Sequence, residues 1–296
     1  MKILLLGNSG QIGYQLERSL SCLGTVIALN RQQLDLTQSA AIIKTMQVVQ
    51  ADVIVNAAAY TAVDMAEKEQ DLAYQINAEA VSVMAQQAVK QHSLLVHFST
   101  DYVFSGKASS PWLEDAVKQP VNHYGLSKLA GEQAIKASGC QYLIIRTSWV
   151  YGTRGNNFLL TIMRLARTQQ QLTVVDDQIG APTWCRHIAD VTSQLLLFYQ
   201  LRQRETLAAP IHTDYHVAAS GQASWYQFAA EILQWLQSQQ IATATLHAVK
   251  SDQYVTAAVR PKYSVLETNK LLRECKMRIP HWKIGLHQAL TEETIR

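Results

Sequence analysis

The sequence of 296 residues has little charge, little cysteine and no long apolar run. Only 17% of the residues are charged, and 26 Lys and Arg against 23 Asp and Glu leave a net charge of +3. This small excess does not indicate the basic surface of a nucleic-acid-binding protein. No apolar stretch approaches the roughly 20 residues of a membrane-spanning helix, and the amino-terminal one is shorter than a signal-peptide core of about 7 to 15 residues. We therefore expect no nucleic-acid or membrane partner.

The four cysteines are too scattered to form a metal-type pair. Without an export signal they are expected to be reduced thiols of a cytoplasmic protein. The histidines form no ligand set either, and His97, inside a predicted strand, is expected to be a packed or sheet-edge residue. The sequence therefore predicts no metal site. The cysteines are Cys22, Cys140, Cys185 and Cys275.

Short apolar runs alternate with longer helical patterns through the first half of the chain. The runs are almost continuously apolar, as expected for strands buried on both faces of a parallel sheet. Strand and helix in alternation predict right-handed crossovers and a doubly wound, Rossmann-type α/β fold. The predicted strands are 3–6, 26–29, 53–55, 94–98 and 142–145, and the predicted helices are 11–23, 37–49, 71–91 and 122–137.

The pattern is less regular in the second half. We expect a dinucleotide-binding domain of residues 1–150, with 184–220 returning to it. Residues 151–183 and 221–296 are expected to form a smaller, C-terminal substrate-binding lobe that closes over a cleft. The elements predicted here are strands 172–175 and 215–219 and helices 187–200 and 225–237.

A glycine-rich turn, Gly7-Asn8-Ser9-Gly10-Gln11-Ile12-Gly13, joins the first strand to the first helix. Glycines let a backbone approach a phosphate closely, and the helix start offers unpaired N–H groups and a positive dipole end. Glycine spacing alone also fits a tight turn without a ligand. The strand–helix units that follow favour dinucleotide binding. The candidate cofactor residues here are Gly7, Gly10, Gln11, Ile12 and Gly13.

The residues after the second predicted strand bear on the type of cofactor. NAD-preferring folds often place an acidic residue about 20 positions after the glycines, to bind the ribose 2′-hydroxyl. Arg31 stands near that position, and its guanidinium can bind a 2′-phosphate. This favours NADPH and leaves NADH open, and Thr37 is predicted to cap the next helix. The candidates at this end are Asn30, Arg31, Asp35 and Leu36.

Tyr124 and Lys128 are four residues apart in a predicted helix, which places both side chains on one face. A free phenol with a pKa near 10 is a poor proton donor near neutrality. A nearby ammonium stabilises the phenolate, and a tyrosine adjusted in this way can protonate the alkoxide formed from a ketone. The pair alone is also typical of an exposed helix surface.

Two other strand ends place small and polar residues at the same sheet edge, where ligands bind in open α/β folds. Hydroxyls at the fourth strand can bind the reacting carbonyl, although they also suit ordinary capping. Small residues after the third strand let a dinucleotide lie against the backbone, although they also suit helix–sheet packing. These candidates are Ser99, Thr100, Asp101 and Tyr102, and Ala57, Ala58 and Ala59.

Several motifs together resemble the extended short-chain dehydrogenase/reductases, and within them the dTDP-4-dehydrorhamnose reductase family. They are GxxGxxG, NAAAYTAVD, STDYVFSG, YGLSK followed by LAGE, RTSWVYG, GNNF at 155–158, DQIGAPT at 177–183, and Arg260-Pro261 with Ser264. The likeness covers essentially the whole chain in consistent order. It implies NADPH-dependent reduction of the 4-keto group of dTDP-4-dehydro-L-rhamnose to dTDP-L-rhamnose, for cell-surface polysaccharide.

The resemblance also implies the roles of single residues. Tyr124 is the proton donor, Lys128 its electrostatic partner and cofactor contact, and Thr100 the assisting hydroxyl. The same Tyr124 and Ser99 border the cofactor. The residues implied to contact the dTDP-sugar are Thr100, Asp101, Tyr102, Tyr124, Trp149 and Asn157.

One position departs from the family pattern. Some members bind Mg²⁺ through glutamates at a dimer interface, the first of them in the opening helix. Here Gln15 stands at that position, and an uncharged amide is a weaker ligand for a hard cation. We therefore expect no metal, and both a monomer and a homodimer stay open.

Two other functions fit the same scaffold. A nucleotide-sugar epimerase or dehydratase keeps and recycles its cofactor, but a dehydratase needs an acidic pair where this chain continues Asp101-Tyr102-Val103. A non-catalytic regulatory subunit, similar to that of methionine adenosyltransferase, has no need of a proton donor such as Tyr124.

Overall fold

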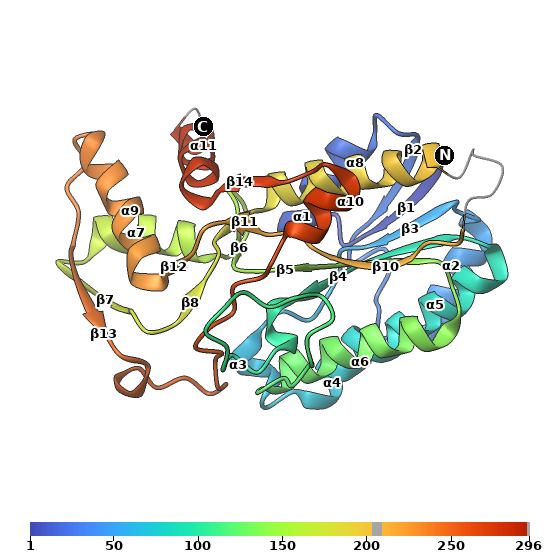
Figure 1. Ribbon diagram of the computed structural model, residues 1–296, viewed down its shortest axis with the longest axis horizontal. Coiled ribbons are helices and arrows are strands. Elements are labelled where there is room, and N and C mark those ends of the chain that lie inside the picture. Colours follow the sequence, from blue (N-terminus) through green and yellow to red (C-terminus); the bar gives the residue numbers. More distant parts are fainter. Residues whose placement is uncertain (203–208, 295–296) are drawn as a thin grey trace.

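The computed structural model describes residues 1–202 and 209–294, and a parallel six-stranded sheet forms its centre (Figure 1). Its strands are β1 (Lys2–Leu6), β2 (Thr25–Leu29), β3 (Val53–Asn56), β4 (Leu94–Thr100), β5 (Tyr142–Thr147) and β10 (His212–His216). They lie in the order β10-β5-β4-β3-β1-β2, and each neighbouring pair is parallel. The chain starts at β1, adds β2 on one side of it and β3, β4, β5 and β10 on the other, and the predicted doubly wound fold is confirmed.

The apolar runs of the sequence form the interior strands because helices cover both faces of the sheet. Every residue of β3 and β4 is buried. One face packs against α1 (Gln11–Leu20) and α8 (Cys185–Arg202), with Leu16 and Leu20 pointing inward from α1. The other face packs against α2 (Ser39–Val49), α5 (Ala80–Gln91) and α6 (His123–Ser138). Figure 1 shows these two helical layers above and below the sheet.

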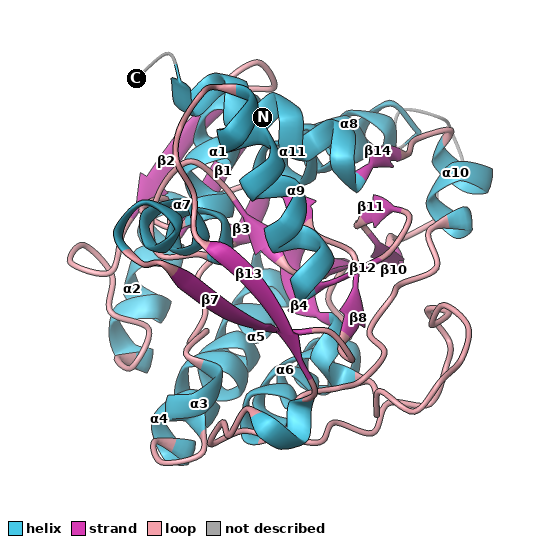
Figure 2. Ribbon diagram, turned by 90° about the vertical axis from the view of Figure 1, so that its left-hand side faces the viewer, coloured by secondary structure: helices cyan, strands magenta, loops and turns pink. Residues whose placement is uncertain are grey.

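The second part of the molecule lies beyond the carboxyl ends of the strands, on the left of Figure 1. Here α7 (Phe158–Thr168) packs against α9 (Trp225–Ser238), and β7 (Gln171–Val175) pairs with β13 (Thr245–Val249). Figure 2 looks onto this part, with β7 and β13 in front. The division into domains stays a prediction, because α10 (Asn269–Cys275), from the segment assigned to the lobe, packs on β10.

Three predicted elements differ from the structure. The strand predicted at 215–219 is β10, which begins and ends earlier, at 212–216. The helix predicted over 71–91 is α4 (Gln70–Tyr74) and α5, separated by a π-helical turn η1 (Gln75–Glu79). Thr37 is not the cap of α2, which begins after Gln38, because the Thr37 amide and hydroxyl bind Asp35 instead.

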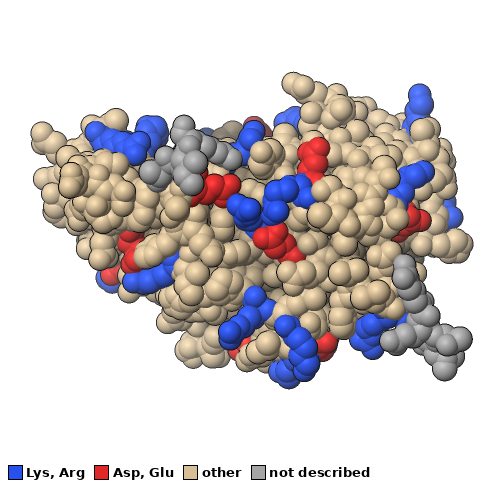
Figure 3. All heavy atoms as spheres, turned by 90° about the horizontal axis from the view of Figure 1, so that it is seen from above, with Lys and Arg blue, Asp and Glu red and all other residues tan. Residues whose placement is uncertain are grey.

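Short elements complete the chain. No helix of residues 1–202 and 209–294 is long and apolar enough to cross a membrane. All four cysteines are free, and the face in Figure 3 mixes basic with acidic side chains. The remaining elements are α3 (Val63–Ala66), η2 (Asp101–Val103), β6 (Val150–Tyr151), β8 (Ile179–Gly180), β9 (Thr183–Trp184), β11 (Ala219–Ser220), β12 (Ala223–Ser224), η3 (Ser251–Gln253), β14 (Ile279–His281) and α11 (Trp282–Thr294).

Candidate active site

A cleft of about 930 Å³ opens at the carboxyl ends of the sheet strands. It gathers all but one of the predicted site residues, although they come from distant parts of the sequence. The exception is Gly13, which lies behind the glycine turn. The predicted residues that line the cleft are Gly7, Gly10, Gln11, Ile12, Asn30, Arg31, Asp35, Leu36, Ala57, Ala58, Ala59, Ser99, Thr100, Asp101, Tyr102, Tyr124, Lys128, Trp149 and Asn157.

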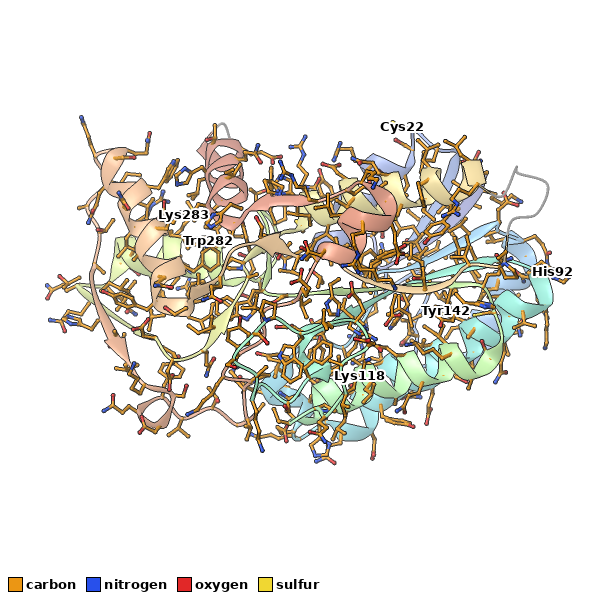
Figure 4. The ribbon with its side chains drawn as sticks, viewed as in Figure 1. Cys22, His92, Lys118, Tyr142, Trp282 and Lys283 are labelled. Carbon is orange, nitrogen blue, oxygen red and sulfur yellow. The ribbon has the colours of Figure 1, made fainter. Side chains whose placement is uncertain are left out.

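A smaller cavity of about 320 Å³ lies at the opposite, amino-terminal edge of the sheet. His92 lines it, beside the start of β5, and Figure 4 shows His92 and Tyr142 at this far right end. Because ligands of open α/β sheets bind at the carboxyl edge, the larger cleft is the candidate site.

The glycine turn brings the start of α1 against the cleft. Gly7 has a φ of +84°, and a Cβ there would stand 2.7 Å from the Ala58 backbone nitrogen. A Cβ on Gly13 would overlap the Gly7 carbonyl. The cap of α1 is Gly10, without a side-chain hydrogen bond, so the first N–H groups of the helix stay available to an anion. The turn therefore fits the diphosphate of a dinucleotide.

The far end of the cleft holds the residues predicted to select the cofactor. Arg31 is exposed at the cleft, where a 2′-phosphate can reach it. Asp35 accepts hydrogen bonds from the Thr37 backbone N–H and hydroxyl, both at 3.0 Å, and these bonds lower the pKa of its carboxyl. Asp35 is therefore a turn-forming carboxylate that also borders the cleft.

The segment Ala57–Ala59 follows β3 and lines the cleft, and we call it the alanine wall. It is held in place by a residue that the sequence analysis missed. Asn77 lies in the π-helical turn, where its side chain accepts from the Tyr60 N–H at 2.9 Å and donates to the Tyr60 carbonyl at 3.0 Å. It also donates to Ser127 at 3.0 Å. The turn thus joins the wall to α6, and a single asparagine inside a helical pattern gave no signal of this.

Tyr124, Thr100 and Asp101 form a polar group in the cleft, in which Thr100 and Asp101 are buried and Tyr124 is half-buried. Thr100 donates to the Asp101 carboxylate at 3.0 Å and accepts from the Tyr102 N–H at 3.2 Å. A hydrogen bond with the Thr100 hydroxyl lowers the pKa of Tyr124, but burial has the larger and opposite effect. Burial raises the pKa of Tyr124 to about 12, and burial also raises the pKa of Asp101. The phenol is therefore held in its neutral, proton-bearing form.

Lys128 lies behind the phenol and binds other groups. Its ammonium nitrogen is 2.6 Å from the Phe98 carbonyl and 3.3 Å from His97 Nε2. Burial lowers the pKa of Lys128 to about 8. The helix spacing correctly places both residues at one cleft, but the pKa of Tyr124 is raised rather than lowered.

The Ser99 hydroxyl binds a buried carboxylate instead of pointing to the proposed cofactor. It donates to Glu132 at 2.6 Å, and Glu132 forms a fully buried ion pair with Arg146, also at 2.6 Å. Arg146 contacts Asp214 as well, at 2.8 Å. This ion pair anchors the end of β4 to α6 and β5, and so fixes the position of the neighbouring Thr100.

Aromatic side chains from the second part of the molecule also line the cleft. The Trp149 and Trp225 rings are stacked 3.5 Å apart, and Phe158 packs against Trp225 at 4.6 Å. Trp149 adopts a φ of +46°, and Gly180 leaves room for its ring. Trp225 and Phe158 line the cleft although they were not predicted as site residues.

Comparisons with known proteins agree with this geometry. Residues 1–295 match the family described as RmlD substrate binding domain. The chain belongs to that family. A dTDP-4-dehydrorhamnose reductase of Escherichia coli (strain K12) is 40% identical over 299 residues, covering 99% of this chain and 98% of the relative. The resemblance stated from the motifs is confirmed.

Two solved structures of the RmlD family superpose on nearly the whole chain. A dTDP-4-dehydrorhamnose reductase of Clostridium acetobutylicum has a TM-score of 0.91 at 34% identity, covering 99% of this chain and 100% of that one. One of Bacillus anthracis, in complex with NADP, has a TM-score of 0.87 at 34% identity, covering 98% and 99%.

Two family motifs have structural roles in addition to lining the cleft. Asn157 caps α7 by accepting from the Leu160 N–H at 3.1 Å, and its amide nitrogen donates to Gln11 at 2.9 Å. It thus joins the glycine turn to α7. Arg260 lines the cleft and pairs with Asp64 at 2.6 Å; the Arg-Pro motif pointed to it, but without a role.

Gln15 stands at the position that the resemblance linked to a metal ligand. This side chain is buried, and its oxygen accepts from Arg18 at 3.4 Å. Among the residues that the structure describes, no group of three His, Cys, Asp or Glu could hold a metal ion.

Proposed function

We propose that the protein reduces the 4-keto group of dTDP-4-dehydro-L-rhamnose with NADPH, giving dTDP-L-rhamnose in deoxysugar-nucleotide biosynthesis. The observation that carries the proposal is the Tyr124–Thr100–Asp101 group, which lines a cleft of about 930 Å³ together with the glycine turn. The names of the RmlD-family relatives, and the NADP complex of one of them, support the same reaction.

The residues of the cleft fit the proposed cofactor, which supplies the hydride when bound. The N–H groups at the start of α1 and the close-packed Gly7 suit its diphosphate. Arg31 suits a 2′-phosphate, which makes NADPH the preferred form. The Ala57–Ala59 segment presents a flat backbone wall without bulky side chains.

Tyr124 is the proposed proton donor. Hydride addition turns the ketone into an alkoxide, which is a far stronger base than a phenolate; the pKa of water, a comparable hydroxyl, is about 15.7. A phenol with its pKa raised to about 12 therefore still protonates the alkoxide, and it stays protonated at neutral pH. The Thr100 hydroxyl is hydrogen-bonded with the phenol and can also meet the substrate oxygen.

The remaining cleft residues have proposed binding roles. Trp149 borders the sugar, with Asp101 and Tyr102 at its other side, and Trp225 and Phe158 continue the aromatic surface for the nucleotide. Lys128 is buried, contacts the β4 backbone and lines the cleft, where it would bind the nicotinamide ribose. The lobe thereby selects the substrate while the sheet edge binds the cofactor.

Replacement of Tyr124 tests the proton transfer. Tyr124→Phe should lower kcat by about 10²–10⁴-fold, the range typical of general acid catalysis, and leave NADPH binding unchanged by fluorescence titration. Tyr151→Phe is the matched control, because the Tyr151 hydroxyl is buried and has no hydrogen-bond partner among the described residues. Full turnover in Tyr124→Phe would rule out the assigned donor.

A further inference from the structure

Behind the alanine wall, three buried side chains form a chain of contacts that ends at Lys128. Asn56 Nδ2 is 3.2 Å from His97 Nδ1, and His97 Nε2 is 3.3 Å from Lys128 Nζ. The three side chains come from β3, β4 and α6, and none is more than 2% exposed. Polar groups so deeply buried must match each donor with an acceptor.

The backbone fixes the orientation of the Asn56 amide. The Ala58 N–H donates to Asn56 Oδ1 at 3.2 Å, and the reversed amide would set two donors against each other. Asn56 Nδ2 therefore faces His97 as a donor, so His97 Nδ1 is the acceptor. In a neutral imidazole the proton must then be on Nε2.

The Nε2–H group points at the Lys128 nitrogen. A neutral amine can accept this hydrogen bond with its lone pair while it donates to the Phe98 carbonyl at 2.6 Å. An ammonium has no lone pair, so the charged form sets two donors against each other at this contact. The lowered pKa of Lys128 and the lowered pKa of His97 agree with this arrangement, and burial is the largest cause of both.

We infer that His97 is a positioning residue of the active site, held by Asn56 in its Nε2–H tautomer, and that this tautomer opposes the charged form of Lys128. The inference rests on the proposed function for its consequence: the imidazole sets the pH range in which Lys128 can support the phenolate left by proton transfer. A buried structural histidine without this role would leave the charge of Lys128 unaffected.

The other charged and titratable groups near Lys128 do not replace this effect. Glu132, one turn further along α6, favours the ammonium, but its carboxylate is bound by Arg146 and Ser99. Tyr124, one turn before, is neutral, and Asp101 beyond it is bound by Thr100 and Ser148. Two groups of β4 directly touch the amine, the Phe98 carbonyl and the His97 ring, and of these two only His97 can titrate.

The tautomer can be read in the wild-type protein by ¹⁵N NMR of histidine-labelled material. We expect a protonated Nε2 and a bare Nδ1 for His97, whose signals are identified by their loss in His97→Phe. His216 is an internal reference for the other tautomer, with the proton on Nδ1, because its Nδ1 faces the Glu267 carbonyl at 3.0 Å. A protonated Nδ1 on His97 would overturn the inference.

Titration of the Lys128 ¹³Cε signal then tests the coupling. Asn56→Asp offers an acceptor to Nδ1, so the proton should move there, and the midpoint for Lys128 should rise by about one pH unit or more. The double variant Asn56→Asp/His97→Phe carries the added negative charge but has no imidazole whose tautomer could change. Asn56→Asp should therefore raise the Lys128 midpoint less in the His97→Phe background than in the wild type. Equal rises would overturn the inference.

The single variant His97→Phe shows in which direction the imidazole shifts the Lys128 midpoint. Removing an opposing donor should raise the Lys128 midpoint, whereas removing an acceptor would lower it and contradict the inference. The basic limb of the kcat profile should move in the same direction as the midpoint in each variant. The NMR measurements need no turnover, so they decide the role of His97 even if the protein acts on another ketone. The wild-type spectrum still decides the tautomer if the Asn56 variants fail to fold.

Discussion

Residue burial sets the chemistry of the cleft more than charge pairing does. Burial raises the pKa of Tyr124 to about 12 and lowers that of Lys128 to about 8. Both shifts favour neutral groups, which suits a site that must first deliver a proton. The spacing of Tyr124 and Lys128 could be read from the sequence. Their burial could not, because it depends on β4 and on the wall after β3.

Removing the buried amine should stabilise the protein while it impairs the reaction. The pKa of Lys128 is lowered from 10.5 to about 8, so charging it in the folded state costs up to about 3 kcal/mol below pH 8. Lys128→Met should therefore gain about 1–3 kcal/mol of unfolding free energy at pH 7, measured in urea, because the lost bond to the Phe98 carbonyl offsets part of this gain.

The pH dependence gives the sign of this effect. The unfolded chain binds the Lys128 proton more readily, so the cost should disappear as pH rises from about 8 to 10.5. The difference between wild type and Lys128→Met should shrink over the same range. Lys44→Met, at an exposed position of α2, is the control and should show no such change. A wild type more stable than Lys128→Met at pH 7 would contradict this account.

At the scale of elements, the glycine turn and α1 act as one binding unit. A Cβ on Gly13 would overlap the Gly7 carbonyl, whereas one on Gly10 would stand 3.3 Å from it. Gly13→Ala should therefore displace the turn and weaken NADPH binding by about 100-fold or more, on a scale where 1.4 kcal/mol is tenfold. Gly10→Ala should weaken it much less. Equal affinities in titration calorimetry would show that the turn does not form the phosphate site.

The elements that differ from prediction show which structural features a sequence pattern can predict and which it cannot. The five strands of the first half were predicted closely because apolar runs bounded by turns dominate the signal. The π-helical turn at 75–79 was not, because it is required by contacts of Asn77 with Tyr60 and Ser127 rather than by local preference. Strand β10 starts earlier than predicted because pairing with β5 sets its limits.

For the site, motifs predicted the lining residues better than the bonds between them. Asn157 was expected to contact the sugar, yet its polar atoms cap α7 and hold Gln11. Ser99 lines the cleft, but its hydroxyl binds Glu132. His97 was expected to be a packed or sheet-edge residue, and it is buried, but it also touches Lys128. Only the folded chain brings these partners together.

At the scale of the whole molecule, the sheet edge and the second part of the chain supply different halves of one cleft. Trp225, from the second part of the chain, stacks on Trp149 and lines the cleft. Trp225→Leu should therefore raise KM for the nucleotide-sugar about tenfold, by loss of an aromatic contact worth about 1–1.5 kcal/mol, and leave the Kd for NADPH unchanged. Trp235→Leu, on the same helix but outside the cleft, is the control. A changed Kd for NADPH with an unchanged KM would reverse the assignment of the two sides.

The long-range connections of the molecule also explain the small net charge. Arg146 is fully buried against Glu132 and Asp214, Arg260 pairs with Asp64, and Arg18 with Asp190. These charged side chains are thus neutralised in ion pairs, and only a few cations line the cleft. A net charge of +3 is sufficient for two anionic ligands that meet in one place.

The most direct test of the reductase assignment is the ratio of NADPH oxidised to product formed from dTDP-4-dehydro-L-rhamnose. The account predicts one NADPH consumed for each dTDP-L-rhamnose released, with hydrogen from the cofactor found at C4. An epimerase or dehydratase would form product without net loss of NADPH. Product formed with no NADPH consumed, or NADPH bound with no ketone reduced, would contradict the account.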